Sequence, residues 1–202
     1  MNSISLFMSL WIKLFFVLTP FFSLTMFLTL TETYDRVRKK RLAITVSMAA
    51  AIICLILFFA GHQIFALFGI TLNSFRIGAG ILLMLSGIEL AQGKTGSLVA
   101  TANDDIAVVP LAIPVLVGPA TTGTVLVMGA ELTTFSGKMI GSFALICAIM
   151  SVGTLLMGAS FMRRLLGLRG LSILSRLTGL ILAALAAQMI MTGVKECLIS
   201  CH

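Results

Sequence analysis

Charged residues are scarce in this chain of 202 residues. Asp, Glu, Lys and Arg together make up 10% of it, whereas an ordinary soluble domain carries about 25%. Apolar residues make up 59%, and the mean hydropathy is +1.13. Too few polar side chains remain to cover a water-exposed surface, which excludes a sizeable soluble domain. The composition predicts an integral membrane protein whose main partner is the lipid bilayer.

Clusters of catalytic or metal-binding side chains are absent as well. No group of His, Asp and Glu falls at membrane depth, and the four cysteines form no C-x-x-C pair, so we expect neither an enzyme nor a bound cofactor. Cys197, Cys201 and His202 stand close together at the end, but a structural zinc site needs about four ligands, and we expect no metal. The net charge of +7 gathers in alternate connections, which is typical of membrane topology and not of nucleic-acid binding.

Six apolar stretches approach or exceed the ~20 residues that a membrane-spanning helix needs. We therefore predict an all-α integral membrane protein with six transmembrane helices in a single domain, residues 1–202. The predicted spans are 7–30, 42–61, 75–92, 107–130, 139–161 and 175–196.

Basic residues are distributed unevenly over the five connections between these spans. The first, third and fifth carry nine Lys and Arg, whereas the second and fourth carry one, Lys138. Cytoplasmic loops are enriched in Lys and Arg, so the odd connections are predicted in the cytoplasm and both termini outside. The most basic connection, 32–41, can also bind anionic lipid, although anchoring the topology is the simpler role.

The two halves of the chain share two short patterns. The third span begins Ser74-Phe75-Arg76-Ile77-Gly78, and the sixth begins Leu174-Ser175-Arg176-Leu177-Thr178-Gly179. Each has a small polar residue and an arginine at the start of a glycine-bearing apolar helix. In the first and fourth spans, Leu18-Thr19-Pro20 aligns with Ala112-Ile113-Pro114.

These matches predict an inverted repeat, because a unit of three helices and its copy enter the membrane in opposite orientations. Repeat one would cover about 7–92, followed by a cytoplasmic loop at about 93–106 and repeat two at about 107–196. Arg76 would then lie at the outer surface and Arg176 at the inner one. Inverted repeats recur among transporters. Chance similarity between apolar helices is the alternative.

Proline is rare, and its four copies, Pro20, Pro110, Pro114 and Pro119, all lie in the first and fourth spans. Each removes a helical hydrogen bond in a medium that offers no replacement. Gly118 leaves the helical conformation at little cost, so we predict a helix that ends near Gly118 and restarts at Pro119, with a milder break at Pro20. Paired broken helices are typical of transporter sites. The alternative is a kink repaired by neighbouring helices.

The breaks predict a binding site near the middle of the membrane. The restarted half-helix has free N–H groups and a positive dipole end that suit a carboxylate, while orphan carbonyls suit an ammonium group or a cation. Gln188, about 18 Å along a helix from Arg176, is either an interhelical hydrogen-bonding residue or a substrate contact. The candidate substrate-binding residues are Pro20, Ser23, Thr25, Pro114, Gly118, Pro119, Thr121, Thr122 and Gln188.

The span interiors offer no acid or base for a substrate of net charge to pair with. Helix ends can hold both charges of a zwitterion. A small neutral zwitterion therefore fits the predicted site better than a charged solute.

The stretch Val109-Pro110-Leu111-Ala112-Ile113-Pro114, followed by Gly118-Pro119, resembles the signature P-L-A-x-P-x-x-x-G-P of the MarC/SnatA family of membrane proteins. Gln188 also matches a position where that family has Gln or Glu. The resemblance covers essentially the whole chain. It implies six helices in inverted repeats, a place in the bacterial inner membrane, and transport of small neutral amino acids such as glycine and alanine. In that membrane the termini, which the positive-inside rule places outside, would be periplasmic.

The chain departs from the family pattern in its first helix, which usually carries N-P-x-G-x-x-P. Thr19 replaces the Asn, Phe22 the Gly and Thr25 the second Pro. Phe22 is bulky where backbone should approach the ligand, so the first half of the site is altered.

Two hypotheses follow. The first is a secondary transporter of a small neutral amino acid that works by rocking one repeat against the other. The second is a non-transporting scaffold or regulatory protein that kept the fold and lost the site. The coupling ion (H+ or Na+), the direction of transport and a homo-oligomeric state stay open.

Overall fold

The computed structural model describes residues 3–93 and 116–200, and this part of the chain is helical without a strand. The apolar runs of the sequence, together with the charged run 36–41, form a few long helices that short turns connect. The helices are α1 (Ser3–Val17), α2 (Pro20–Leu30), α3 (Arg36–Phe68), α4 (Leu72–Gln92), α6 (Pro119–Glu131), α7 (Phe135–Met157) and α8 (Ala159–Ser200).

Five helical stretches within the described residues are long and apolar enough to cross a membrane, with α1 and α2 together counting as one. The fourth predicted span, 107–130, is described only in its second half, which forms α6, because residues 107–115 lie outside the described part. The prediction of an all-α, multi-pass membrane fold is therefore confirmed.

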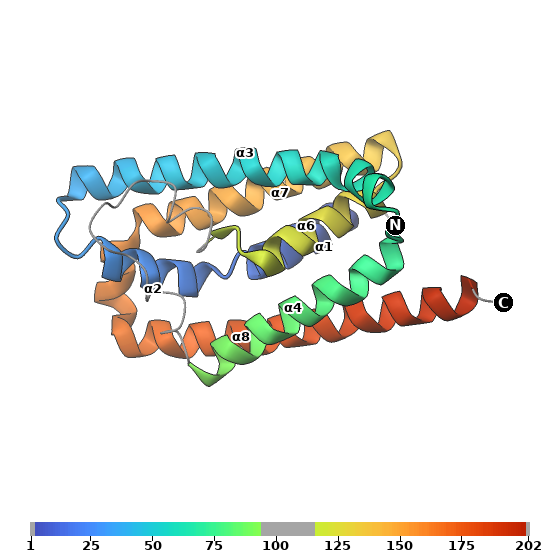
Figure 1. Ribbon diagram of the computed structural model, residues 1–202. Coiled ribbons are helices and arrows are strands. Elements are labelled where there is room, and N and C mark those ends of the chain that lie inside the picture. The colour runs from blue at the N-terminus through green and yellow to red at the C-terminus, as the bar shows by residue number, and fades with distance from the viewer. Residues whose placement is uncertain (1–2, 94–115, 201–202) are drawn as a thin grey trace.

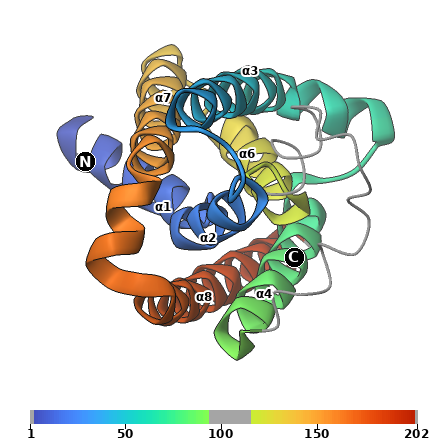
Figure 2. The ribbon, with the colours of Figure 1, turned by 90° about the vertical axis from the view of Figure 1, so that its left-hand side faces the viewer.

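The helices form three layers, which Figure 1 shows from the side and Figure 2 from one end. The pair α3 and α7 forms one outer layer, and the pair α4 and α8 forms the other. Between them lie α1, α2 and α6: α1 packs on α7, α2 on α8, and α6 on both α3 and α4. These pairings are compatible with an inverted repeat, which stays a prediction.

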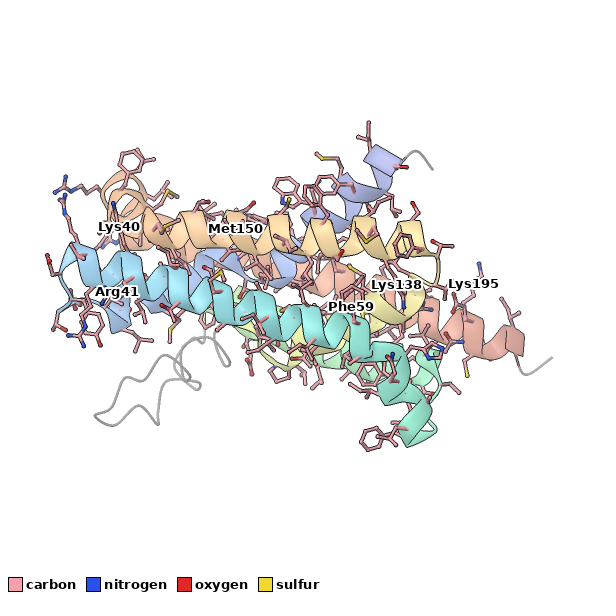
Figure 3. The ribbon with its side chains drawn as sticks, turned by 90° about the horizontal axis from the view of Figure 1, so that it is seen from above. Lys40, Arg41, Phe59, Lys138, Met150 and Lys195 are labelled. Atoms are coloured by element: carbon pink, nitrogen blue, oxygen red, sulfur yellow. The ribbon has the colours of Figure 1, made fainter. Side chains whose placement is uncertain are left out.

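The two ends of the bundle differ in their basic side chains. The termini and the turns after α3 and α6 lie at one end, which we call the terminal end, and the turns after α2 and α7 lie at the other, the basic end (Figure 1). Figure 3 shows Lys40 and Arg41 at the basic end, with Lys138 and Lys195 opposite. The positive-inside rule predicts that the basic end faces the cytoplasm.

Two helices extend beyond their predicted bounds. The run Arg36–Arg41, which we predicted to be part of a connection, forms the first turns of α3 after the N-cap residue Asp35. Arg and Lys are good helix formers, so the charges end the apolar span without ending the helix. Likewise α8 begins at Ala159 rather than near 175, and bends sharply at Gly167, whose φ of 64° lies in the left-handed region.

The α4–α8 pair owes its close approach to glycines. A Cβ on Gly87 would lie 2.8 Å from the Ala183 nitrogen, and one on Gly179 would lie 2.6 Å from the Gly87 carbonyl oxygen. Small residues let membrane helices approach until their backbones touch. By contrast, a Cβ on Gly78 would meet no atom within 4 Å. Gly87 therefore contributes to the close contact with α8, and Gly78 does not.

Candidate functional site

The first span is fully interrupted in its middle. Helix α1 ends at Val17 and α2 begins at Pro20, and Thr19 between them has a left-handed backbone, with φ 47° and ψ 59°. A β-branched residue rarely adopts this conformation, because its side chain crowds the backbone. The predicted break at Pro20 is therefore confirmed, and it is stronger than the mild break we expected.

The fourth span restarts where the sequence predicts. Gly118 is extended, with φ −74° and ψ 176°, and α6 begins at Pro119. Proline at the first helical position needs no hydrogen-bond partner for its nitrogen. The restart at Pro119 is confirmed, whereas the candidate site residue Pro114 lies outside the described residues.

The two half-helices α2 and α6 start close together in the middle of the bundle and run toward opposite ends (Figure 1). The first intrahelical bonds are donated by the Ser23 N–H to the Thr19 carbonyl and by the Thr122 N–H to the Gly118 carbonyl, both over 2.9 Å. The N–H groups before them have no acceptor within their own helix. The positive ends of both helix dipoles therefore meet at the break.

Three of the predicted hydroxyls bond carbonyls of the interrupted first span. Thr121 Oγ1 donates to the Val17 carbonyl across 3.2 Å, and Ser23 Oγ donates to the Leu18 carbonyl across 3.2 Å. Both side chains are buried. Thr25 Oγ1 donates to the Phe21 carbonyl in its own helix. These hydroxyls supply partners for carbonyls near the break.

A cavity of about 300 Å³ lies between α1, α4, α6 and α8, on the terminal side of the break. This volume is at the small end of ligand-binding pockets. Val17, at the end of α1, joins the cavity to the break. The polar residues that line it are Lys13, Arg76, Thr124, Glu131, Gln188 and Thr192, and the apolar ones are Leu10, Val17, Leu83, Val127, Met128, Leu185 and Met189.

Arg76 is the most buried charge at this cavity, with 5% of its surface exposed. Its Nη2 lies 2.5 Å from Glu131 Oε1 and its Nη1 lies 2.6 Å from Glu196 Oε2. The guanidinium thus ties α4 to the end of α6 and to α8. The expectation that the span interiors offer no buried charge is wrong at Arg76, which is buried although it lies near the start of α4 at the terminal end. The two carboxylates make its burial tolerable, because a paired buried charge costs far less than an isolated one.

Lys13 is half-buried on α1 and lines the same cavity. No carboxylate in residues 3–93 or 116–200 lies within ion-pair distance of its ammonium group. Lys13 is not among the site residues predicted from the sequence. The signal was present, since an ionisable residue inside a membrane span is a functional candidate by default.

Gln188 also lines the cavity, from α8. Its backbone carbonyl accepts a hydrogen bond from Thr192 Oγ1 at 2.8 Å. In the described part of the chain its side-chain amide forms no hydrogen bond to another helix. Of the other candidate residues, none lines this cavity: Pro20, Ser23, Thr25, Gly118, Pro119, Thr121 and Thr122 lie at the break beyond Val17.

An apolar cluster extends from the cavity wall toward the basic end. Val17 and Leu83 belong both to this cluster and to the cavity wall. Leu90, seven residues after Leu83, lies about 10 Å further along α4. Phe22, with 7% of its surface exposed, packs from α2 into this cluster with residues of α1, α4, α6 and α8. The cluster consists of Val17, Phe22, Met26, Leu83, Leu90, Ala120, Leu182 and Ala186.

This fold defines a multi-pass integral membrane protein whose first span is interrupted and whose fourth span has a helix start at Pro119. A family model described as "MarC family integral membrane protein" matches residues 4–198, and the chain belongs to that family. It is 32% identical over 205 residues to a UPF0056 membrane protein of Aquifex aeolicus, which covers 96% of this chain and 94% of the relative.

Two other relatives agree with this assignment. A UPF0056 membrane protein of Methanocaldococcus jannaschii is 33% identical over 93% of this chain and 95% of its own length. The UPF0056 inner membrane protein YhgN of Escherichia coli is 29% identical over 91% and 93%. No solved structure matches the chain. The resemblance to the family is thereby confirmed.

Proposed function

We propose that this protein is a secondary transporter of a small neutral amino acid, such as glycine or alanine. The observation that carries the proposal is the meeting of two half-helix starts, α2 and α6, directly beyond a polar cavity. Interrupted spans of this kind hold substrates in transporters, because their free N–H groups and carbonyls replace water.

The cavity supplies an entrance that suits a zwitterion. Lys13 is a cavity cation without a carboxylate partner among the described residues, so it attracts the substrate carboxylate. The side chain of Gln188 offers an oxygen to the ammonium group and an N–H to the carboxylate. Arg76 is already paired with two carboxylates, those of Glu131 and Glu196, so it does not bind the carboxylate of the substrate.

Beyond Val17 the substrate would reach the break. There the starts of α2 and α6 hold its carboxylate, with Gly118 and Pro119 on one side and Pro20 on the other. The apolar cluster around Phe22 would form the barrier toward the basic end. Transport would open this cluster and close the Arg76 end, as one half of the bundle rocks against the other.

The test is uptake of labelled glycine and alanine into proteoliposomes, compared with empty liposomes. Wild type should show saturable uptake. Pro119→Leu should abolish it, because leucine continues a helix through the break and removes the half-helix start. Phe135→Leu is the matched control, since Phe135 is the first residue of α7 and is 82% exposed, and its uptake should equal that of wild type. Wild-type protein that takes up neither solute would overturn the proposal.

A second candidate is a non-transporting scaffold, and one observation favours it. Phe22 is buried where relatives with the family pattern have glycine, and the hydroxyls of Ser23 and Thr121 are already bonded to backbone. A break filled in this way leaves less room for a ligand. Co-purification of a stoichiometric partner, with no thermal stabilisation by any small amino acid, would favour the scaffold.

A further inference from the structure

A second cavity, of about 510 Å³, lies at the basic end of the bundle, away from the candidate substrate site. Its wall comes from the start of α3, the turn from α7 into α8, and Phe27 on α2. We call it the basic cavity. Its lining residues in α3 are Arg36, Lys39 and Lys40, and those from the α7–α8 region are Leu156 to Phe161 and Arg164.

Helix geometry gathers the charges of the basic cavity. Residues i, i+3 and i+4 of a helix share one face, so Arg36, Lys39 and Lys40 project from the same side of α3. Arg164 on α8 completes the set across the cavity. A loop at 32–41, as the sequence predicts, would not fix these three side chains on one face.

The four cations of the basic cavity have no acidic partners in the described residues. The nearby Glu32 pairs instead with Arg163, at 3.4 Å, and Asp35 does not line the cavity. The positive-inside rule explains why basic residues gather at this end. It does not explain why four of them surround one cavity in which the described residues place no carboxylate, and like charges held together favour binding of an anion.

The remaining wall of the basic cavity is apolar. Phe27 and Leu156 are each 1% exposed and form its inner side. Phe161 is 67% exposed and Met157 is 39% exposed, so both reach outward into the surrounding lipid. A cationic hollow beside exposed apolar side chains at the end of a membrane bundle has the polarity pattern of an anionic phospholipid.

We propose that the basic cavity binds a phosphate group, supplied by the headgroup of an anionic phospholipid whose acyl chains lie against Met157 and Phe161. Basic pockets between helices on the cytoplasmic side of membrane proteins bind such headgroups. The site is independent of the proposed transport function, and it would anchor the α7–α8 turn to the start of α3.

The test measures binding of phosphatidylglycerol to the full-length protein in detergent, by native mass spectrometry and thermal shift. Phosphatidylcholine with the same acyl chains is the comparison, since it carries the phosphate but no net charge. Wild type should bind phosphatidylglycerol preferentially. Lys40→Gln and Arg164→Gln should each weaken that binding roughly fivefold, and the double variant should weaken it further.

Two variants are matched controls. Arg38 stacks on the Tyr34 ring at 4.2 Å, and Arg169 lies further along α8; neither lines the basic cavity. Arg38→Gln and Arg169→Gln remove the same charge from the same end and should bind as wild type does. An equal loss in these controls would mean a diffuse basic surface and would overturn the site.

Inorganic phosphate separates the two sources of the anion. Weak competition by millimolar phosphate, together with strong phosphatidylglycerol binding, identifies the lipid headgroup as the ligand. Tight binding of phosphate itself would assign the site to a free anion and overturn the lipid source. Wild type that binds phosphatidylglycerol and phosphatidylcholine equally would overturn the proposal without any variant.

Discussion

Thr121 Oγ1 donates a hydrogen bond to the carbonyl oxygen of Val17, 3.2 Å away and 104 residues earlier in the chain. Val17 is the last residue of α1, and Thr121 lies in the first turn of α6. The carbonyls at the end of a helix lack intrahelical partners, and lipid offers none. The interruption of one span is thus stabilised by the restarted half of another, and neither break is independent of the other.

Thr121→Val should destabilise the protein by about 1–3 kcal/mol, because it keeps the shape of the side chain and leaves the buried Val17 carbonyl unpaired. The measurement is the free energy of unfolding in detergent. Thr122→Val is the control, since the hydroxyl of Thr122 forms no hydrogen bond within the described residues and the side chain is half-buried. Equal stability of the two variants would show that the bond to Val17 contributes nothing.

Thr19→Asn should stabilise the fold. Thr19 has the only positive φ among the non-glycine residues that the structure describes, and a left-handed backbone costs an ordinary L-residue about 1–2 kcal/mol, which asparagine tolerates better. Asparagine is also the usual residue of the MarC/SnatA pattern here. The midpoint of thermal unfolding should rise, whereas Thr133→Asn, in the turn between α6 and α7, should leave it unchanged. A lower midpoint of thermal unfolding in Thr19→Asn would contradict backbone strain at this position.

Gly87→Ala should lower stability by about 1–3 kcal/mol, because the added methyl group would lie 2.8 Å from the backbone nitrogen of Ala183 and force α4 away from α8. The methyl group that Gly78→Ala adds elsewhere on the same helix would have no atom within 4 Å. This variant should be neutral or slightly stabilising, since alanine is the better helix former. Chemical unfolding of both variants in the same detergent compares them, and a Gly87→Ala protein as stable as Gly78→Ala would refute the close contact.

The two carboxylates that hold Arg76 should behave non-additively. Glu131→Gln or Glu196→Gln alone leaves one partner for the guanidinium, and both carboxylates are partly exposed, so each should cost about 1 kcal/mol or less. The double variant leaves a buried arginine without a counter-charge and should cost about 3 kcal/mol or more. Unfolding of the three variants gives the coupling, and Glu32→Gln, from an exposed pair, is the control. If the loss in the double variant equals the sum of the two single losses, the burial of Arg76 does not depend on a remaining carboxylate partner.

The sequence predicts the local events of this fold well. The helix restarts at Pro20 and Pro119 are dictated by proline itself, whose ring and missing N–H act at one position whatever surrounds it. Apolar runs likewise locate the spans. The start of α3 at Arg36 was not predicted, because hydropathy shows which part of a helix lies in the membrane and not how far the helix continues beyond it.

The candidate site depends on contacts between distant segments, which is why it was only partly predictable. Arg76 meets Glu131 and Glu196 at ends of three different helices, and no local pattern pairs them. Gln188 was predicted as a candidate and does line the cavity. Lys13 lines the same cavity from α1 but was not predicted as a site residue, because a single lysine in an apolar span does not reveal which helices it faces.

The most direct test of the proposed transport route is the initial rate of labelled glycine uptake by Lys13→Gln beside Lys138→Gln in proteoliposomes. Lys13 lines the cavity, whereas Lys138 lies on α7 at the same end of the bundle and does not line it (Figure 3). If the cavity admits the substrate carboxylate, Lys13→Gln should lower the rate at least tenfold, while Lys138→Gln transports as wild type does. Wild-type rates in both variants would contradict a route through this cavity.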